Sequence, residues 1–220
     1  MSDMDVQKIT GFVMPIGSGA VGKTSLALTL EKQTIPLDWE DTIRKVQKTL
    51  NLEFNYVVDP IQIKGHLFQV THQYLVPPGQ KAIEVAEKGR SFEDVIEIYR
   101  AIIRRVDVIL LSYKINDLDT YHEIEYWVEN VNGIINDKTN FILVGTHLDA
   151  IDKREVTDEM VKSGVQYVTS LIRNIRPTWK GHIASLEVSN INGENTAQLR
   201  KMISGFIILA TGIKVNSEGR

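Results

Sequence analysis

Residues 17–24 read GSGAVGKT, with Gly17, Ser18, Gly19, Ala20, Val21, Gly22, Lys23 and Thr24 in that order. An apolar strand pattern ends just before this stretch and a helix pattern begins within it, which is the setting in which GxxxxGKT forms a phosphate-binding loop. Glycines at positions 17 and 22 let the backbone N–H groups curl around a polyphosphate. The stretch therefore predicts a site for a nucleoside triphosphate.

Each part of the motif has a chemical role. Lys23 is predicted to reach the β and γ phosphates, as a binding and catalytic cation, and the hydroxyl of Thr24 to coordinate Mg²⁺. The helix that begins here directs the positive end of its dipole at the anion. We therefore expect Gly17 through Thr24, together with Ser25, to bind the nucleotide.

Composition limits the class of protein. The chain has 220 residues, 43% of them hydrophobic, and a net charge of −3, so we expect one α/β domain over residues 1–214 and a disordered tail over 215–220. The absence of a dense basic run indicates neither a nucleic-acid face nor a membrane patch. With no cysteine and no leader pattern, we expect a cytoplasmic protein without a lipid anchor.

Strand and helix patterns alternate along the chain, which predicts a mainly parallel sheet with helices on both faces. Two adjacent strands suit an antiparallel pair, so one edge strand should run against the other five. Strands are predicted at 9–16, 50–58, 66–76, 107–113, 140–145 and 182–188. Helices are predicted at 23–33, 121–135, after an N-cap at Thr157 and after an N-cap at Asn195.

A second site feature follows the strand predicted at 140–145. Asp149 lies just beyond its carboxyl end, where open α/β sheets bind ligands. A carboxylate there can accept hydrogen bonds from both N1–H and the 2-amino group of guanine, whereas adenine has an acceptor at N1 and no 2-amino group. The position predicts a preference for GTP over ATP.

With the phosphate loop and Asp149 in place, the chain resembles the Ras superfamily of small GTPases. The fourth motif of that family is usually Asn-Lys-x-Asp; here Thr146, His147 and Asp149 give the Thr-His-x-Asp form found in Roc domains, close to the Thr-Lys-x-Asp of the Rho branch. The resemblance implies that His147 lies against the base. It also implies a fifth motif at Ser189 and Asn190, with the Ser189 backbone near the base oxygen.

The third motif departs from most of the family. Residues 76–80 read VPPGQ, where most small GTPases have Asp-x-x-Gly-Gln. Bacterial MglA-type GTPases carry a similar Val-Pro-Gly-Gln form. The resemblance implies that Gly79 donates its N–H to the γ phosphate and that Gln80 orients the attacking water. Loss of the aspartate removes one outer partner of Mg²⁺.

Two threonines compete for the metal in the first switch. Thr42 has the spacing common in small GTPases, whereas Thr49 fits the MglA pattern better. In the second register Lys48 stands where MglA proteins have an arginine finger. Because an ammonium lacks the planar fork of a guanidinium, we expect intrinsic hydrolysis to be slow.

The resemblance leads to a function and to partners. We expect a GTP/GDP switch that binds a regulator, either a roadblock-type GTPase-activating protein or an exchange factor, and an effector. A monomer and a nucleotide-dependent dimer both stay open. Residues 81–105 are predicted to be rich in helix, with Val95, Ile98, Ile102 and Ile103 packing on the sheet.

Two other functions fit parts of the sequence. A GTP-binding interaction module without hydrolysis would explain the missing aspartate and the lysine at position 48. An ATP-dependent kinase would need an arginine-rich lid, for which Arg100, Arg104 and Arg105 are the one cluster.

Trp127 is predicted in the core, and Trp39 either packs in a loop or contacts nucleotide or partner. His66, His72, His122 and His182 are predicted to be structural.

Overall fold

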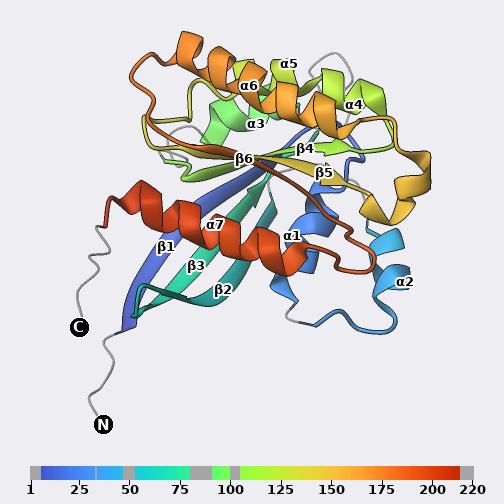
Figure 1. Ribbon diagram of the computed structural model, residues 1–220, viewed down its shortest axis with the longest axis horizontal. Helices are drawn as coiled ribbons and strands as arrows, with labels where there is room; N and C mark the ends of the chain where they lie inside the picture. Colours follow the sequence, from blue (N-terminus) through green and yellow to red (C-terminus); the bar gives the residue numbers. More distant parts are fainter. Residues whose placement is uncertain (1–5, 33, 47–52, 80–90, 100–104, 214–220) are drawn as a thin grey trace.

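The computed structural model describes residues 6–32, 34–46, 53–79, 91–99 and 105–213. Within them, one six-stranded sheet has the order β2-β3-β1-β4-β5-β6 (Figure 1). All neighbouring strands pair in parallel except β2 and β3, which confirms the predicted α/β fold with one antiparallel edge strand. The strands are β1 (Val6–Ile16), β2 (Glu53–Ile63), β3 (His66–Val76), β4 (Val108–Lys114), β5 (Asn140–Thr146) and β6 (Ile183–Glu187).

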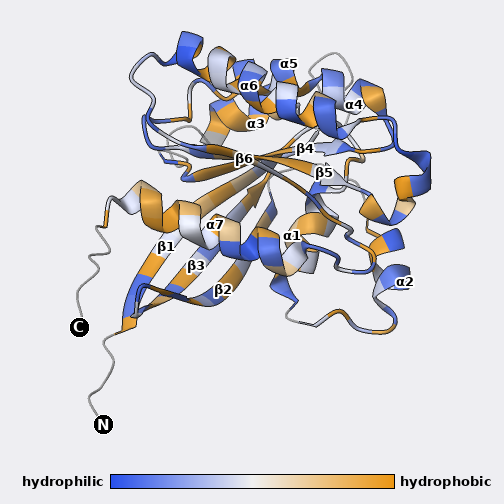
Figure 2. Ribbon diagram, viewed as in Figure 1, coloured by the Kyte–Doolittle hydropathy of each residue, from blue (hydrophilic) through white to orange (hydrophobic). Residues whose placement is uncertain are grey.

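Helices cover both faces of the sheet, as Figure 1 shows. On one face lie α3 (Phe92–Tyr99), α4 (Leu118–His122), α5 (Ile124–Asn130) and α6 (Asp158–Ile175); on the other lie α1 (Lys23–Glu31) and α7 (Thr196–Thr211). Each face has its own apolar cluster. In Figure 2 the central strands are predominantly hydrophobic, whereas hydrophilic and hydrophobic residues alternate along the helices. No described helix is both long and apolar enough to cross a membrane.

The hairpin of β2 and β3 is longer than predicted. Its turn consists of Lys64 and Gly65, with φ of 48° and 83°. Two successive positive φ angles are typical of a two-residue turn whose twist matches that of the strands, so pairing continues up to Ile63 and His66. The predicted start of the first strand at residues 50–52 lies outside the described residues.

The helix predicted over 121–135 is wrong in its extent. The chain forms two short helices, α4 and α5, which meet at Glu123, where ψ is −5°. The first begins early because Asp117 accepts a hydrogen bond from the Thr120 N–H and caps it. Trp127 is 1% exposed, which confirms its place in the core.

One of the two predicted caps is confirmed. The hydroxyl of Thr157 accepts a hydrogen bond from the Met160 N–H at the start of α6. Asn195 precedes α7 but does not cap it: its φ is 60°, and its side chain donates to the Glu187 carbonyl. The sequence pattern could not show this competing acceptor, which lies at the end of β6.

The prediction for the segment before β4 is correct for one residue and wrong for another. Val95 is buried, whereas Ile98 is 52% exposed, because the apolar face of α3 turns away from it. Ile102 and Ile103 lie outside the described residues, as do the predicted helical stretches at 81–90 and 100–104 and the tail at 215–220.

Candidate nucleotide-binding site

A cavity of about 720 Å³ lies at the edge of the sheet where the parallel strands end. Open α/β sheets bind ligands at this edge, and the volume is in the range of small-molecule sites. Ten of the predicted residues line it: Gly19, Ala20, Gly22, Lys23, Thr24, Ser25, Gly79, His147, Asp149 and Asn190. The other described residues of the prediction do not line it: Gly17, Ser18, Val21, Thr42, Thr146 and Ser189.

The phosphate loop needs its glycines. Gly17 and Gly22 have φ of 144° and 89°, where other residues are strained. A Cβ at position 17 would collide with the Ser112 carbonyl oxygen, and one at position 22 would lie 2.8 Å from Nδ2 of Asn190. The loop therefore approaches β4 on one side and the predicted fifth motif on the other.

Lys23 points into the loop. Its side chain is buried, and Nζ donates to the carbonyl oxygens of Gly17 and Ser18 at 2.7 and 2.8 Å. Gly79 lies against the same group, since a Cβ there would be 2.7 Å from each of those two carbonyl oxygens. The structure thus brings the end of β3 next to the predicted phosphate-binding lysine.

The hydroxyl of Ser18 has partners that were not predicted. It donates to the Glu123 carboxylate and accepts a hydrogen bond from Nε1 of Trp127 at 3.3 Å. Glu123 lies at the junction of α4 and α5 and Trp127 within α5, both more than 100 residues along the chain. The helical spacing that placed Trp127 in the core gives no sign of this contact.

Asp149 and Ser189 meet, although they follow different strands. The Ser189 hydroxyl donates to Oδ1 of Asp149 at 2.6 Å and accepts from the N–H groups of Ile191 and Asn192 at 3.2 Å each. The single hydroxyl proton is therefore directed at the carboxylate. Ser189 is fully buried and Asp149 exposed, so a buried hydroxyl orients the carboxylate at the cavity wall.

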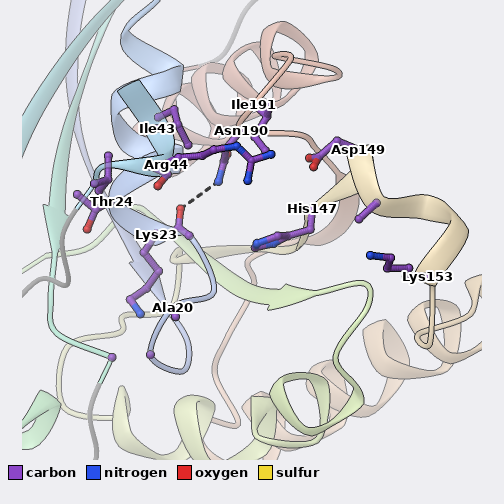
Figure 3. A pocket seen from close by; sticks show the side chains of 16 residues that line it. Ala20, Lys23, Thr24, Ile43, Arg44, His147, Asp149, Lys153, Asn190 and Ile191 are labelled. Carbon is purple, nitrogen blue, oxygen red and sulfur yellow. Dashed lines mark hydrogen bonds between the residues drawn. The ribbon is translucent and has the colours of Figure 1, made fainter. Parts of the chain in front are cut away.

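Thr146 and His147 connect β5 to the phosphate loop. The Thr146 hydroxyl lies 2.8 Å from the Val21 carbonyl oxygen and 2.9 Å from Nδ1 of His147. His147 has a φ of 65°, which turns its ring into the cavity (Figure 3). Burial lowers the pKa of His147, and the nearby cation of Lys114 lowers it further, which favours the neutral ring.

Asn190 contacts two parts of the site. Its Nδ2 donates to the Gly22 carbonyl at 3.1 Å, the dashed line in Figure 3. The backbone carbonyl of Asn190 accepts a hydrogen bond from Nε1 of Trp39 at 3.0 Å. The prediction for the fifth motif concerned the backbone near the base; the side-chain contact with the phosphate loop was missed.

The stretch predicted to be the first switch borders the cavity, but not through Thr42. In α2 (Trp39–Arg44) the Thr42 hydroxyl donates to the Asp38 carbonyl, whereas Arg44 faces the cavity (Figure 3). Arg44 forms an exposed ion pair with Glu40 at 2.6 Å, and this hydrogen bond raises the pKa of the guanidinium. Lining residues missed from the sequence are Ile43, Arg44, Val46, Ala150, Lys153 and Ile191.

Three predicted residues, Lys48, Thr49 and Gln80, lie outside the described part of the chain. Within that part, no group of three or more His, Cys, Asp or Glu side chains could hold a metal ion. Thr24 lines the cavity, and a threonine hydroxyl together with phosphate oxygens and water suits Mg²⁺, which prefers oxygen ligands. The donor set thus fits a metal that arrives with the nucleotide.

Of the three arginines considered for a kinase lid, the structure describes Arg105, and this residue makes a contact away from the cavity. Nε of Arg105 donates at 2.6 Å to Asp107, whose other oxygen accepts from the Phe12 N–H. This pair joins β1 to the start of β4 and is not part of the cavity lining. Arg100 and Arg104 lie outside the described residues.

The chain is similar in sequence to known proteins of the Ras family. The sequence model of the Ras family matches residues 91–171. Ras-related protein Rab-21 of Geodia cydonium is 25% identical over 165 residues, which are 72% of this chain and 58% of that protein. Ras-related protein Rab-12 of Homo sapiens is 25% identical over 160 residues, or 72% and 56%. The matches thus span little more than half the length of these relatives, and they confirm the resemblance of the chain to the small GTPases of the Ras superfamily.

Proposed function

We propose that this chain is a small GTP-binding protein that acts as a GTP/GDP switch and hydrolyses GTP slowly unless a partner assists. The observation that carries the proposal is the shared cavity, since the phosphate loop and Asp149 line the same space of about 720 Å³. A phosphate loop alone is common to many nucleotide-binding proteins. A carboxylate at the base end of the same cavity favours guanine.

In this proposal Lys23 turns from the loop carbonyls to the β and γ phosphates. The exchange is inexpensive because one set of charge-assisted hydrogen bonds replaces another. Thr24 would hold Mg²⁺ beside the phosphates, and the metal would neutralise phosphate charge there. Asp149, oriented by Ser189, would accept two hydrogen bonds from guanine, and the neutral ring of His147 would lie against the base.

Slow hydrolysis is argued from what surrounds the phosphate end. Among the described residues that line the cavity, Asp149 alone carries a carboxylate, and it belongs to the base end. Position 76 holds Val76 in place of the family aspartate. The same observation favours the second candidate, a GTP-binding interaction module that does not hydrolyse its ligand.

Two motifs resemble particular branches of the small GTPases, and we include both resemblances in the proposal. The VPPGQ stretch suggests an MglA-like second switch, and the Thr-His-x-Asp motif a Roc-like or Rho-like base site. A switch acts through partners, so we propose an effector and a regulator, with a roadblock-type protein as the candidate regulator. Either Thr42 or Thr49 would join the metal once nucleotide orders the first switch, and Lys48 would take the place of an arginine finger.

The switch is tested by hydrogen exchange of the full chain loaded with GDP or with a non-hydrolysable GTP analogue. We expect peptides from residues 36–50 and 75–95 to exchange more slowly with the analogue, because the γ phosphate orders both segments. Peptides from β5, which is fully buried, serve as the internal control. Identical protection in the two states would refute the switch.

Multiple-turnover phosphate release separates the switch from the interaction module. Slow release that is further reduced by Gln80→Leu would support hydrolysis with the proposed water-orienting glutamine. Tight GTP binding with no release, unchanged by the same substitution, would favour the module.

A further inference from the structure

Trp39 is buried, and it also makes a long-range hydrogen bond through its indole N–H. Its side chain is 5% exposed, so burial alone accounts for an aromatic residue here. Its Nε1–H, however, donates at 3.0 Å to the backbone carbonyl of Asn190, which lies 151 positions further along the chain. Lys32 adds a cation–π contact, with Nζ 5.5 Å from the ring centroid. The indole therefore joins the first switch to the predicted base-binding loop.

The indole is the main donor to that carbonyl. The Thr29 hydroxyl is also within reach at 3.2 Å, but it has a single proton and lies closer, at 2.7 Å, to the Ser25 carbonyl within its own helix. The Asn190 side chain meanwhile donates to the Gly22 carbonyl. Asn190 thus connects the base loop, the phosphate loop and α2.

This contact ties α2 to the loop that carries Asn190. Ile43 is one turn of the helix beyond Trp39 and is 8% exposed, and both Ile43 and Arg44 line the nucleotide cavity. On the other side of the cavity lies Asp149 (Figure 3). If the indole leaves the Asn190 carbonyl, this wall of the cavity loses a hydrogen bond that holds it to the base loop.

We propose that Trp39 is a positioning residue that latches α2 over the cavity and thereby sets how long the nucleotide stays bound. The inference rests on the proposed function and deepens it. Release of nucleotide requires α2 to swing away, and this breaks the buried hydrogen bond between the indole and the base loop. A partner that pulls on α2 would open the latch without touching the nucleotide.

The test compares two tryptophan variants in the full chain. Trp39→Phe keeps an aromatic ring but removes the N–H. Trp179→Phe is the matched control, because Trp179 is 7% exposed and its Nε1 donates at 2.7 Å to another backbone carbonyl, that of Thr139, outside the cavity lining. Both variants should lose similar thermal stability, so stability alone cannot explain a difference between them.

Dissociation of fluorescently labelled GDP in Mg²⁺ is the first readout. We expect Trp39→Phe to speed release about fivefold, the effect of losing one buried hydrogen bond, and Trp179→Phe to leave the rate within twofold of wild type. Equal rates in all three proteins, or equal acceleration in both variants, would overturn the latch.

Hydrogen exchange of the nucleotide-free proteins is the second readout and does not depend on the ligand. Peptides covering residues 36–46 should exchange faster in Trp39→Phe and unchanged in Trp179→Phe. Unchanged exchange of these peptides in Trp39→Phe would overturn the latch even if GDP binds tightly. If exchange rises as expected but the wild type binds no labelled GDP, the latch contact stands and the proposed function, with the latch's role in it, is refuted.

Discussion

Asp149→Asn should change the base that the cavity accepts. The structure predicts how the new amide is oriented, because the Ser189 hydroxyl directs its single proton at Oδ1 of residue 149. The asparagine oxygen will take that hydrogen bond and turn its NH₂ group towards the base. Guanine presents donors at N1 and at the 2-amino group, so donor would face donor.

The expected loss can be worked out from these contacts. A hydrogen bond to a charged group contributes about 1.5–3 kcal/mol, and a buried donor left without an acceptor costs about as much again. We therefore expect GDP affinity to fall by about 3 kcal/mol or more, which is over a hundredfold. Xanthine carries an oxygen in place of the 2-amino group and can accept from the new NH₂, so XDP affinity should rise.

Calorimetric titration with GDP and with XDP measures both changes. Asp152→Asn is the matched control, since Asp152 is exposed in the same short helix, η2 (Leu148–Lys153), and does not line the cavity. The control should bind both nucleotides like the wild type. An Asp149→Asn variant with unchanged GDP affinity, or with equal losses for GDP and XDP, would refute the assignment of Asp149 to the base.

Gly79→Ala should weaken GTP binding at least tenfold and GDP binding less in parallel titrations, because the new methyl group would lie 2.7 Å from two loop carbonyls beside Lys23; equal affinity for GTP would show that this backbone does not approach the γ phosphate. Arg44→Ala should weaken GDP binding about tenfold or more, because one charge-assisted hydrogen bond contributes about 1.5 kcal/mol or more. Glu40→Ala, which removes the other half of the exposed ion pair, should not weaken it; equal losses would assign the effect to the helix. Burial lowers the pKa of His72 to about 4, with a smaller effect from a nearby arginine. Above pH 6.5 the ring is neutral in both the folded and the unfolded chain, and below pH 6.5 the unfolded chain takes up a proton first, which destabilises the folded state. In urea titrations of wild type and His72→Phe, the free energy of unfolding of the wild type should therefore fall by up to about 3 kcal/mol more between pH 6.5 and 4. Parallel pH profiles for the two proteins would contradict this.

The low pKa of His72 has a structural cause. Its Nε2 is 2.8 Å from the Ser204 hydroxyl, which donates to Asp59 at 2.6 Å, and its Nδ1 is 3.2 Å from the Tyr74 hydroxyl. If Nε2 carries the proton, each of these three hydrogen bonds pairs one donor with one acceptor: Nε2–H donates to Ser204, Ser204 donates to Asp59, and Tyr74 donates to Nδ1. Arg200, the nearby cation, disfavours a second proton on the ring. The sequence prediction that this histidine is structural fits these contacts.

Local sequence patterns were sufficient for most of the fold. The order of strands and helices, the antiparallel edge and the burial of Trp127 all follow from periodicity and turn residues, which act over a few positions. The errors lie where a distant group competes with the local signal. The side chain of Asn195 donates a hydrogen bond to the Glu187 backbone carbonyl instead of capping α7. At Glu123, which accepts a hydrogen bond from Ser18, the predicted single helix is divided into α4 and α5.

The candidate site could be predicted only in part for the same reason. The phosphate loop and Asp149 belong to short motifs whose spacing reflects their chemistry, and they line the cavity. The contacts of Trp39 with Asn190 and of Ser18 with Trp127 join segments more than 100 residues apart and leave no periodic trace. Arg44 looks like any exposed helix residue until the fold brings α2 to the cavity.

Calorimetric titration of the nucleotide-free protein with GTP, GDP and ATP in Mg²⁺ probes the phosphate loop and Asp149 together, and so tests guanine-nucleotide binding in a single experiment. We expect tight binding of both guanine nucleotides and no measurable binding of ATP. Equal or preferred binding of ATP would contradict the role of Asp149, and no binding of any nucleotide would contradict the role of the loop.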